Sequence, residues 1–479
     1  MAALAVWYCY AHRYILYYGD AQAHLNISRS IVDSRTPGYE QIGTVWLPLL
    51  HVLALPLVGS MWLWSNGLAG SIPVAICYVI AGCCLYLTAR EAYTSTRAAL
   101  VSTACFAFNP NVLYLASVPM TEIVFLAGLF VLLLAMVRFR ATQRAAWIVC
   151  GIFASLAMSM TRYDGWFLIS FSAAWFGFFA RRHRFRVFLL IAFCASAAPL
   201  YWAAHCWWET GNALDFYNGP YSAKAIQAGR PYPGYHDWAA AIRYYAAAGR
   251  LCAGLPLILL GVAGGVCALA RERFAILAFL LLTPAFYVWS MHSSGNPIFI
   301  PTLPPSSYYN TRYGVAVVAL AAFAAGAIML ILPRRHRWFG LLIPVVSLVP
   351  WFFHPTIERV ICWKESEVNS IARRGWTDEA AAFLAGTYKP GQGILAPFGD
   401  VTGVFCRARI PLADVLHEGN GPAWMANATR PDLVHQSLWA LAQAGSPLSK
   451  RLESSGAYDP LHDITVPGAP ALEIFKRKK

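Results

Sequence analysis

The sequence predicts an all-α polytopic membrane domain of about eleven transmembrane helices, followed by a small C-terminal α/β domain. Of the 479 residues, 58% are hydrophobic and only 13% are charged. A soluble chain does not need so apolar a composition, because its surface must remain wet. The apolar residues also recur in runs of about 18–22, the length that crosses about 30 Å of hydrocarbon.

The candidate spans follow one another through the first three quarters of the chain. They lie at residues 1–17, 68–89, 98–117, 121–137, 145–161, 166–180, 187–207, 251–270, 274–292, 313–332 and 338–354. The first run lacks a basic start and a small-residue cleavage site, so we interpret it as the outer part of a first span rather than a cleavable signal peptide.

The charges between the spans predict the orientation of the chain. Arginine clusters occur at 90–97, 138–144, 181–186, 271–273 and 334–337, in alternate loops. Because cytoplasmic loops are enriched in Lys and Arg, these loops are predicted to be inside. The loop after the first span and the C-terminus are then outside. We expect a multi-pass protein of the inner (plasma) membrane.

One apolar run, at residues 44–58, does not fit this alternation. It is short and contains two prolines and a histidine. We interpret it as a re-entrant or interfacial helix on the outer face, where non-spanning helices and Pro near a helix start are tolerated.

The composition changes near residue 355, where we place the boundary between a transmembrane domain, 1–354, and a soluble extracytoplasmic α/β domain, 355–479. The second part holds 13 of the 23 acidic residues. Helices are predicted at 364–374, 377–387 and 431–444, and strands at 393–396 and 470–475. Its two cysteines, Cys362 and Cys406, could form a disulfide on the oxidising side of the membrane.

The net charge of +14 does not indicate a nucleic-acid partner. The positive charge lies in short clusters between apolar runs, as in membrane anchoring, and no nucleic-acid-binding motif is present. The expected surroundings of the chain are membrane lipids.

Ionisable residues at membrane depth are functional candidates, and here they gather at the outer boundary. Asp20 directly follows the first span, and His24 lies four residues on, on the same helix face. Glu122 falls in the first turn of an inward-running span. Arg162, in the sequence TRYDGW, and Arg312, in NTRYG, stand at the outer ends of two further spans.

Each candidate also has an ordinary structural explanation. Asp20 could cap a helix, and Glu122 could be favoured by the helix dipole. Arg162 could simply pair with Asp164. Arg312 could be an interfacial arginine in a tyrosine belt.

Taken together, two carboxylates and two arginines at one boundary suit a reaction on a lipid-linked phosphosugar. A carboxylate removes a proton from an acceptor hydroxyl. The arginines, or a divalent cation such as Mg²⁺ or Mn²⁺ held by Asp20 and Glu122, stabilise the departing phosphate.

The order of motifs resembles the GT-C superfamily of integral-membrane glycosyltransferases, which includes the dolichyl-phosphate-mannose protein mannosyltransferases and the lipid A aminoarabinose transferase. The similar stretches are GDAQAH at 19–24, PGYEQIGTVWLPLLH at 37–51, FNPNVLYLASVPMTE at 108–122, TRYDGW at 161–166 and NTRYG at 310–314. The sequence departs from the family in the first loop, where Asp20 is followed by Ala21 rather than a second acidic residue.

This resemblance implies a transfer of sugar from a polyprenyl-phosphate donor to an extracytoplasmic acceptor, which is a protein, lipid or glycan. It implies Asp20 as the catalytic base and Glu122 near the donor or metal. Arg162, Arg312 and His24 are the expected contacts of the donor phosphate. A role of the C-terminal domain in acceptor selection is a further hypothesis.

Two other functions are alternatives to this sugar transfer. A transporter or lipid flippase places its charges near the bilayer midplane, often in two related halves, whereas here the charges lie at the outer boundary. An O-antigen-ligase-like oligosaccharide transferase would have a long outer loop rich in Arg and His, for which the segment 208–250 is the candidate.

Overall fold

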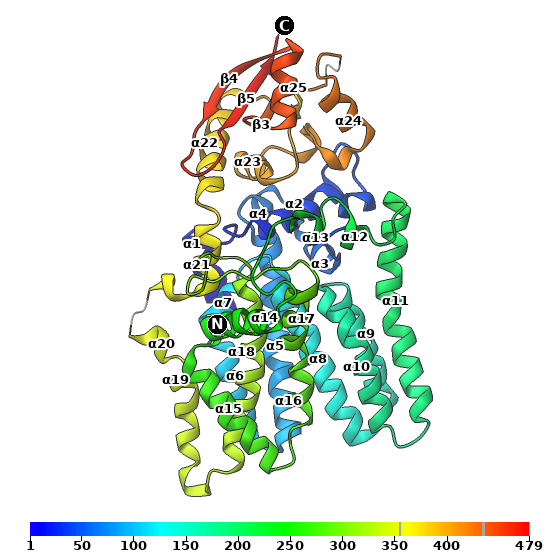
Figure 1. The fold of residues 1–479 in the computed structure, drawn as a ribbon, viewed down its shortest axis with the longest axis vertical. Coiled ribbons are helices and arrows are strands. Elements are labelled where there is room, and N and C mark those ends of the chain that lie inside the picture. Colours follow the sequence, from blue (N-terminus) through cyan, green and yellow to red (C-terminus); the bar gives the residue numbers. More distant parts are fainter. Residues whose placement is uncertain (228, 354–355, 434–435, 479) are drawn as a thin grey trace. The chain divides into compact units, whose positions relative to one another are not determined.

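The computed structural model describes residues 1–227, 229–353, 356–433 and 436–478, shown in Figure 1. The chain divides into two compact units. Unit 1 contains residues 1–7, 44–49 and 74–365, and unit 2 contains residues 8–43, 50–73 and 366–479. The predicted domain boundary between residues 354 and 355 lies outside the described residues.

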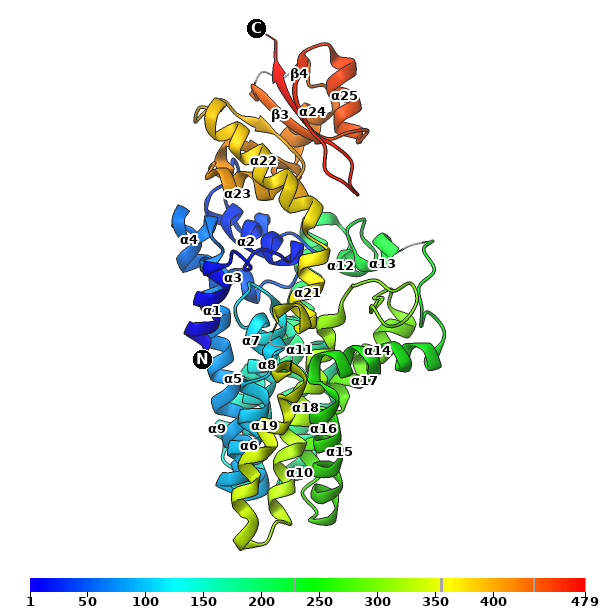
Figure 2. The same cartoon turned by 90° about the vertical axis from the view of Figure 1, so that its left-hand side faces the viewer.

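Unit 1 is helical, and its longer helices run side by side in both views (Figures 1 and 2). Its principal helices are α5 (Leu68–Tyr93, which begins in unit 2), α6 (Thr96–Ala107), α7 (Pro110–Leu115), α8 (Thr121–Thr142), α9 (Ala145–Ser159), α10 (Tyr163–Phe179), α11 (Arg184–Thr210), α12 (Asp215–Asn218), α13 (Ala223–Gln227), α14 (Trp238–Ala253), α15 (Leu255–Ala270), α16 (Ala275–Leu280), α17 (Leu282–Ser293), α18 (Val315–Gly326), α19 (Leu342–Ser347), α20 (Val349–Phe352) and α21 (Ile361–Val368). The 3₁₀ turn η2 (Thr311–Gly314) leads into α18.

Five helical stretches of the described chain are long and apolar enough to cross a membrane. They are 68–93, 121–142, 184–210, 275–293 and 311–330, and the pair α14 and α15, bent by 104°, would add a sixth. The other predicted spans are shorter or interrupted helices. The predicted span 98–117, for example, is broken where Asn109 caps the new helix α7, which starts at Pro110, since proline cannot continue a helix but suits its first turn. A polytopic, mostly helical membrane domain is thus confirmed.

Unit 2 joins the start of the chain to its end. Its N-terminal elements are the end of α1 (Ala2–Ala11), α2 (Gly19–Val32), η1 (Tyr39–Ile42), most of α3 (Leu49–Val58) and α4 (Met61–Ser65). The core of this unit contains Leu25, Val58 and Trp64 together with Phe405 and Ile474 of the tail. The segment that carries Asp20 therefore shares one hydrophobic core with the C-terminal domain.

The tail contains a five-stranded mixed sheet flanked by helices. The strands are β1 (Ile394–Leu395), β2 (Val415–Leu416), β3 (Trp439–Gln443), β4 (Tyr458–Ile464) and β5 (Leu472–Arg477), in the order β2-β1-β3-β5-β4. Strand β1 pairs parallel with β2 and β3, and β5 pairs antiparallel with β3 and β4. The helices of the tail are α22 (Ile371–Thr387), α23 (Gly403–Ala408), α24 (Pro422–Thr429) and α25 (Pro447–Ser455). The predicted α/β class of this part is confirmed.

Within the tail, some predicted elements are confirmed and one is wrong. Helix α22 and strands β1 and β5 lie where the pattern placed helix and strand. The predicted helix at 431–444 is wrong, because residues 439–443 form the central strand β3; residues 434–435 lie outside the described residues. The alanines and leucine of its sequence, WALAQ, favour a helix. The segment nevertheless forms a strand, because it pairs with β1 on one edge and with β5 on the other.

The possible disulfide between Cys362 and Cys406 is not formed, because both side chains are reduced cysteines in the structure. Cys362 lies in unit 1, where its sulfur is 4.0 Å from that of Cys252. Cys406 lies in unit 2, and its thiol contacts the carbonyl oxygen of Trp64.

Candidate active site

Three of the predicted site residues meet in unit 1, although they come from distant parts of the sequence. Oε1 of Glu122, in the first turn of α8, accepts hydrogen bonds from Arg162 Nη1 at 3.1 Å and from Arg312 Nε at 3.0 Å. Arg162 caps the start of α10, and Arg312 lies in η2. The side chains of Glu122, Arg162 and Arg312 are 2%, 14% and 9% exposed, so this is a buried ion-pair network.

A fourth member, Glu365 of α21, was not predicted. Its Oε1 accepts a hydrogen bond from Arg312 Nη1 at 2.9 Å, and its Oε2 accepts one from the Arg312 backbone N–H at 3.3 Å. Glu365 is only 1% exposed. Arg312 therefore bridges two buried carboxylates that lie 243 residues apart in the sequence.

Asp164 extends the network on the side of Arg162. Asp164 Oδ1 lies 3.3 Å from Arg162 Nε, and Asp164 Oδ2 accepts a hydrogen bond from Tyr287 of α17 at 2.9 Å. The guanidinium of Arg162 lies over the ring of Tyr313 at 4.9 Å. The ordinary interpretation of Arg162, a pair with Asp164, is thus correct, but Arg162 binds Glu122 as well.

Two glycines of the TRYDGW and NTRYG motifs explain how the chain brings these groups together. A Cβ at Gly165 would lie 2.6 Å from the backbone carbonyl of Met158, so only glycine lets α10 start so close to the end of α9. A Cβ at Gly314 would lie 2.4 Å from the backbone oxygen of Ala248 in α14. Each glycine permits a close backbone approach beside one of the two arginines.

The network has a saturated side and an unsaturated side. Both oxygens of Glu365 accept hydrogen bonds from Arg312. On the other side, Glu122 Oε2 is buried without a hydrogen-bond partner among the described residues, and Arg162 Nε and Asp164 Oδ1 share only their 3.3 Å ion-pair contact. Buried polar atoms are normally satisfied. The unsaturated side, which also includes the most exposed side chain, Arg162, is where a ligand could bind.

The charges of the network nearly balance. Three carboxylates face two guanidinium groups, which leaves one excess negative charge if all five groups are ionised. Burial raises the pKa of Glu365, while the nearby Arg312 and its hydrogen bonds oppose this.

Asp20 and His24, the two remaining predicted residues, belong to unit 2. Asp20 lies half-buried in the first turn of α2, and His24 follows one turn later, as predicted. His24 Nδ1 lies 2.8 Å from Nε2 of His51 in α3. Burial lowers the pKa of His51 to about 3, so this ring is neutral at ordinary pH. Asp20 belongs to unit 2 and the Glu122 network to unit 1, and the role of Asp20 stays a prediction.

Helix α2 is anchored to the C-terminal domain by the buried Arg373 and by Asp33. Arg373 of α22 donates hydrogen bonds to the side chain of Gln22 and to the carbonyl oxygen of Tyr17, on either side of Asp20. Asp33, after the end of α2, accepts from the backbone N–H groups of Leu412 and Ala413. The position of the Asp20 helix therefore depends on the tail.

Sequence reasoning missed Glu365 and Tyr287. Glu365 lies on a short helix after the last predicted span, in a region assigned to the soluble domain. The only available sign of Glu365 in the sequence was its position, a carboxylate just beyond the outer end of a predicted span. Glu122 was selected as a candidate by the same criterion. A tyrosine such as Tyr287 inside an apolar helix carries no such signal, because tyrosines are common near membrane interfaces.

Comparison with known proteins finds a family match for part of the chain. Residues 51–208, about a third of the chain, match the family described as dolichyl-phosphate-mannose-protein mannosyltransferase. A comparison with curated proteins finds no match.

Two solved structures share the fold over almost the whole chain. ArnT from Cupriavidus metallidurans bound to undecaprenyl phosphate superposes with a TM-score of 0.60 at 12% identity, covering 98% of this chain and 97% of that chain. The apo state of the same protein gives 0.60 at 13% identity, with 95% and 93% covered. At this identity the likeness shows a common fold.

Residues 51–208 are therefore similar to the mannosyltransferase family, and the chain has the fold seen in ArnT.

Proposed function

We propose that this enzyme transfers a sugar, with inversion, from a polyprenyl monophosphate to a hydroxyl group of an extracytoplasmic acceptor. The observation that carries the proposal is the buried network in which Glu122, Arg162 and Arg312 converge from three distant segments. The undecaprenyl phosphate bound to the ArnT structure supports a polyprenyl-phosphate ligand for the shared fold.

In this proposal Asp20 is the general base. Its carboxylate takes the proton of the acceptor hydroxyl while the hydroxyl oxygen attacks the anomeric carbon. The bond between that carbon and the phosphate oxygen breaks, and the polyprenyl phosphate leaves with the electron pair. Attack from the face opposite the leaving group inverts the anomeric centre.

The developing phosphate charge would be stabilised by cationic groups. Arg162 is the best-placed, since its side chain is the most exposed of the network and its Nε makes only a 3.3 Å ion-pair contact, with Asp164. Arg312, locked between Glu122 and Glu365, would act mainly by holding Glu122 in place. His24 is the corresponding candidate in unit 2.

A divalent cation, Mg²⁺ or Mn²⁺, bound by Asp20 and Glu122, is a second way to stabilise the phosphate. Glu122 Oε2 has no hydrogen-bond partner among the described residues and is a suitable hard oxygen ligand. No group of three or more His, Cys, Asp and Glu side chains that could hold a metal ion occurs in the described part of the chain. A bound ion would therefore depend on water or on the substrate phosphate for its other ligands.

The orientation and location of the enzyme belong to the same proposal. We place it in the inner (plasma) membrane, with the active site and the C-terminal domain on the extracytoplasmic or periplasmic side. The support is the arginine-rich set of alternate loops. The acceptor, a protein, lipid or glycan, would then be reached from outside.

The proposal is tested by measuring transfer of radiolabel from a panel of polyprenyl-phosphate sugars into membrane acceptors. Purified enzyme is assayed with and without a chelator, and sugar nucleotides serve as control donors. Transfer from at least one polyprenyl-phosphate sugar, and none from sugar nucleotides, is expected. Loss of transfer with chelator and recovery with Mg²⁺ or Mn²⁺ would assign the metal role, whereas transfer from sugar nucleotides alone would contradict the proposed donor.

A further inference from the structure

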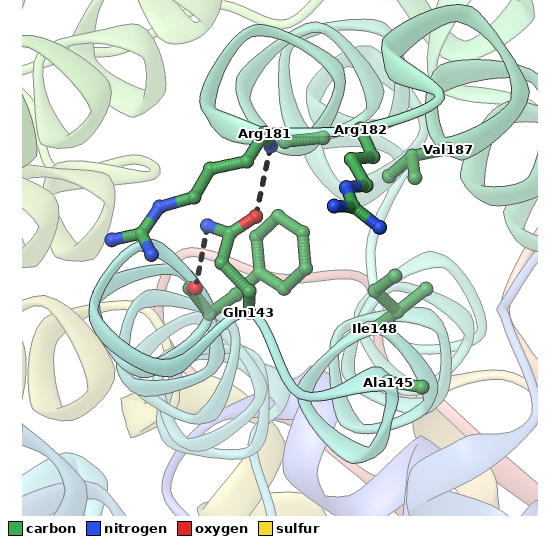
Figure 3. A pocket seen from close by; sticks show the side chains of 8 residues that line it. Gln143, Ala145, Ile148, Arg181, Arg182 and Val187 are labelled. Carbon is green, nitrogen blue, oxygen red and sulfur yellow. Dashed lines mark hydrogen bonds between the residues drawn. The ribbon is translucent and has the colours of Figure 1, made fainter.

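A second polar site lies in unit 1 at the arginine-rich ends of the helices. It is a cavity of about 310 Å³ between the end of α8, the start of α9 and the loop from α10 to α11 (Figure 3). This volume is at the lower end of the range of about 300–1,000 Å³ that is usual for small-ligand pockets. Its lining includes Gln143, Arg181 and Arg182 on the polar side and Phe139, Ile148 and Val187 on the apolar side.

The two cations of this cavity are available to a ligand. Neither Arg181 nor Arg182 has a carboxylate partner among the described residues, and both are exposed. Neighbouring arginines are engaged elsewhere, since Arg184 Nε donates to the carbonyl oxygen of Ala180 and Arg140 lies over the ring of Phe179. No acidic side chain is among the lining residues.

Gln143 holds the cavity in shape. Its side-chain oxygen accepts the backbone N–H of Arg181 at 2.9 Å, and its Nε2 donates to the carbonyl oxygens of Phe139 and Phe179. The bonds to Arg181 and Phe179 tie the α8–α9 turn to the end of α10 and the loop that follows it, and Figure 3 shows the bond to Arg181. The shape of the cavity is thus fixed by hydrogen bonds between two loops.

The backbone adds further positive potential. Helices α9 and α11 both start beside the cavity, and neither has a side-chain cap or an acidic residue in its first turn. Unsatisfied N–H groups and the helix dipole favour an anion at such ends.

The apolar lining continues onto surfaces suited to lipid. Val149 and Phe153 of α9, and Phe185 and Phe193 of α11, are exposed large hydrophobic side chains. An occupant with a phosphate group and hydrocarbon chains could place its phosphate at the arginines and its chains along these faces.

We propose that this cavity binds the phosphate headgroup of an anionic phospholipid, in the leaflet on the side that the loop charges predict to be cytoplasmic. The occupant is a membrane diacyl lipid, distinct from the donor carrier that the Glu122 network would serve. The proposal does not depend on the transferase reaction.

Native mass spectrometry of the full chain in detergent tests this, with phosphatidylglycerol and phosphatidylcholine as probes. Wild type is expected to retain phosphatidylglycerol in preference to phosphatidylcholine. The double variant Arg181→Ala/Arg182→Ala should bind phosphatidylglycerol about thirtyfold more weakly, the scale expected for two arginines at a membrane surface. The matched control, Arg271→Ala/Arg273→Ala, removes the same charge from exposed positions of another loop on the same predicted side and should change binding by less than about twofold.

A second variant, Ile148→Trp, fills the cavity without changing its charge and should also reduce phosphatidylglycerol binding. Inorganic phosphate at millimolar concentration should not displace the lipid. Equal losses in the control and the Arg181/Arg182 variant, equal retention of both lipids, or displacement by phosphate alone would each overturn the proposal.

Discussion

Arg312 joins Glu122, near the start of α8, to Glu365, almost at the end of the membrane unit. A buried ion pair does not add much net stability, because desolvation offsets the attraction between the charges. Removing one partner is costly, however, since it leaves the other charges buried and unpaired. Removal of Arg312 would leave two such carboxylates, those of Glu122 and Glu365.

We therefore expect Arg312→Met to destabilise the membrane unit by about 3–5 kcal/mol, seen as a lower thermal midpoint in detergent. Adding Glu365→Gln should recover part of the loss, because one of the stranded charges is removed. As a control, Arg407→Met breaks the exposed Arg407–Asp378 pair, which has the same 2.9 Å separation as the Arg312–Glu365 pair, and should cost at most about 1 kcal/mol. Similar losses in the two single variants would show that burial of the network is unimportant.

At the scale of single residues, the sequence identified three of the five charged members of the network. Glu122, Arg162 and Arg312 were recognisable because they stand at predicted span ends on one side. Asp164 was considered only as a partner of Arg162. Glu365 was missed because no local pattern encodes its pairing with Arg312, which lies 53 positions away in the sequence.

The loop after strand β2 contains a buried histidine that couples the α/β domain to pH. His417 is 1% exposed and caps η8 (Glu418–Asn420), its Nδ1 accepting the backbone N–H of Gly419. Burial, with a smaller contribution from Arg35, lowers the pKa of His417 from 6.5 to about 4. Its folded form thus stays neutral where the unfolded chain takes up a proton.

Between pH 6.5 and about 4, the unfolded chain binds more protons at His417 than the folded chain does. The free energy of unfolding of unit 2 therefore falls as the pH falls through that range, by about 3 kcal/mol at most. His417→Asn keeps an acceptor for the cap and does not titrate. The variant should lose less stability than wild type between pH 7 and 4, measured as thermal midpoints. Some loss of stability on acidification should remain in the variant, since His51 is also buried in its neutral form. Parallel curves for the two proteins would contradict the assignment.

At the scale of elements, local signals predicted helix starts well and strand pairing poorly. Helix α2 starts at Gly19 and α8 starts just after Pro119, as the cap and proline patterns indicate. Strand β4 was missed, and β3 was predicted as helix. Both are determined by their neighbours in the sheet, which lie up to tens of residues away in the sequence.

At the scale of the molecule, the division into compact units indicates that the C-terminal domain supports the Asp20 segment, a role different from acceptor selection. Its core includes Leu25 of α2, and its Arg373 holds the chain on both sides of Asp20. Deleting the tail would therefore expose part of the core that supports the predicted base. A loss of activity in a deletion variant would report this support as much as any selection of acceptors.

The orientation of the whole chain is open to a direct measurement. With the arginine-rich loops inside, the C-terminus is expected outside. A C-terminal alkaline phosphatase fusion should be active and a C-terminal green fluorescent protein fusion dark, since each reporter works on one side of the membrane. The opposite result would place the C-terminal domain in the cytoplasm and reverse the proposed side of transfer.

The central claim is that Asp20 acts as the base in sugar transfer, and the sharpest measurement compares two first-loop variants. Asp20→Asn should fold like wild type and transfer sugar about 10²–10⁴-fold more slowly, the usual scale for loss of a general base. Glu40→Gln, an exposed carboxylate in the same loop and unit, should retain full activity. Wild-type turnover by a folded Asp20→Asn enzyme would contradict the account.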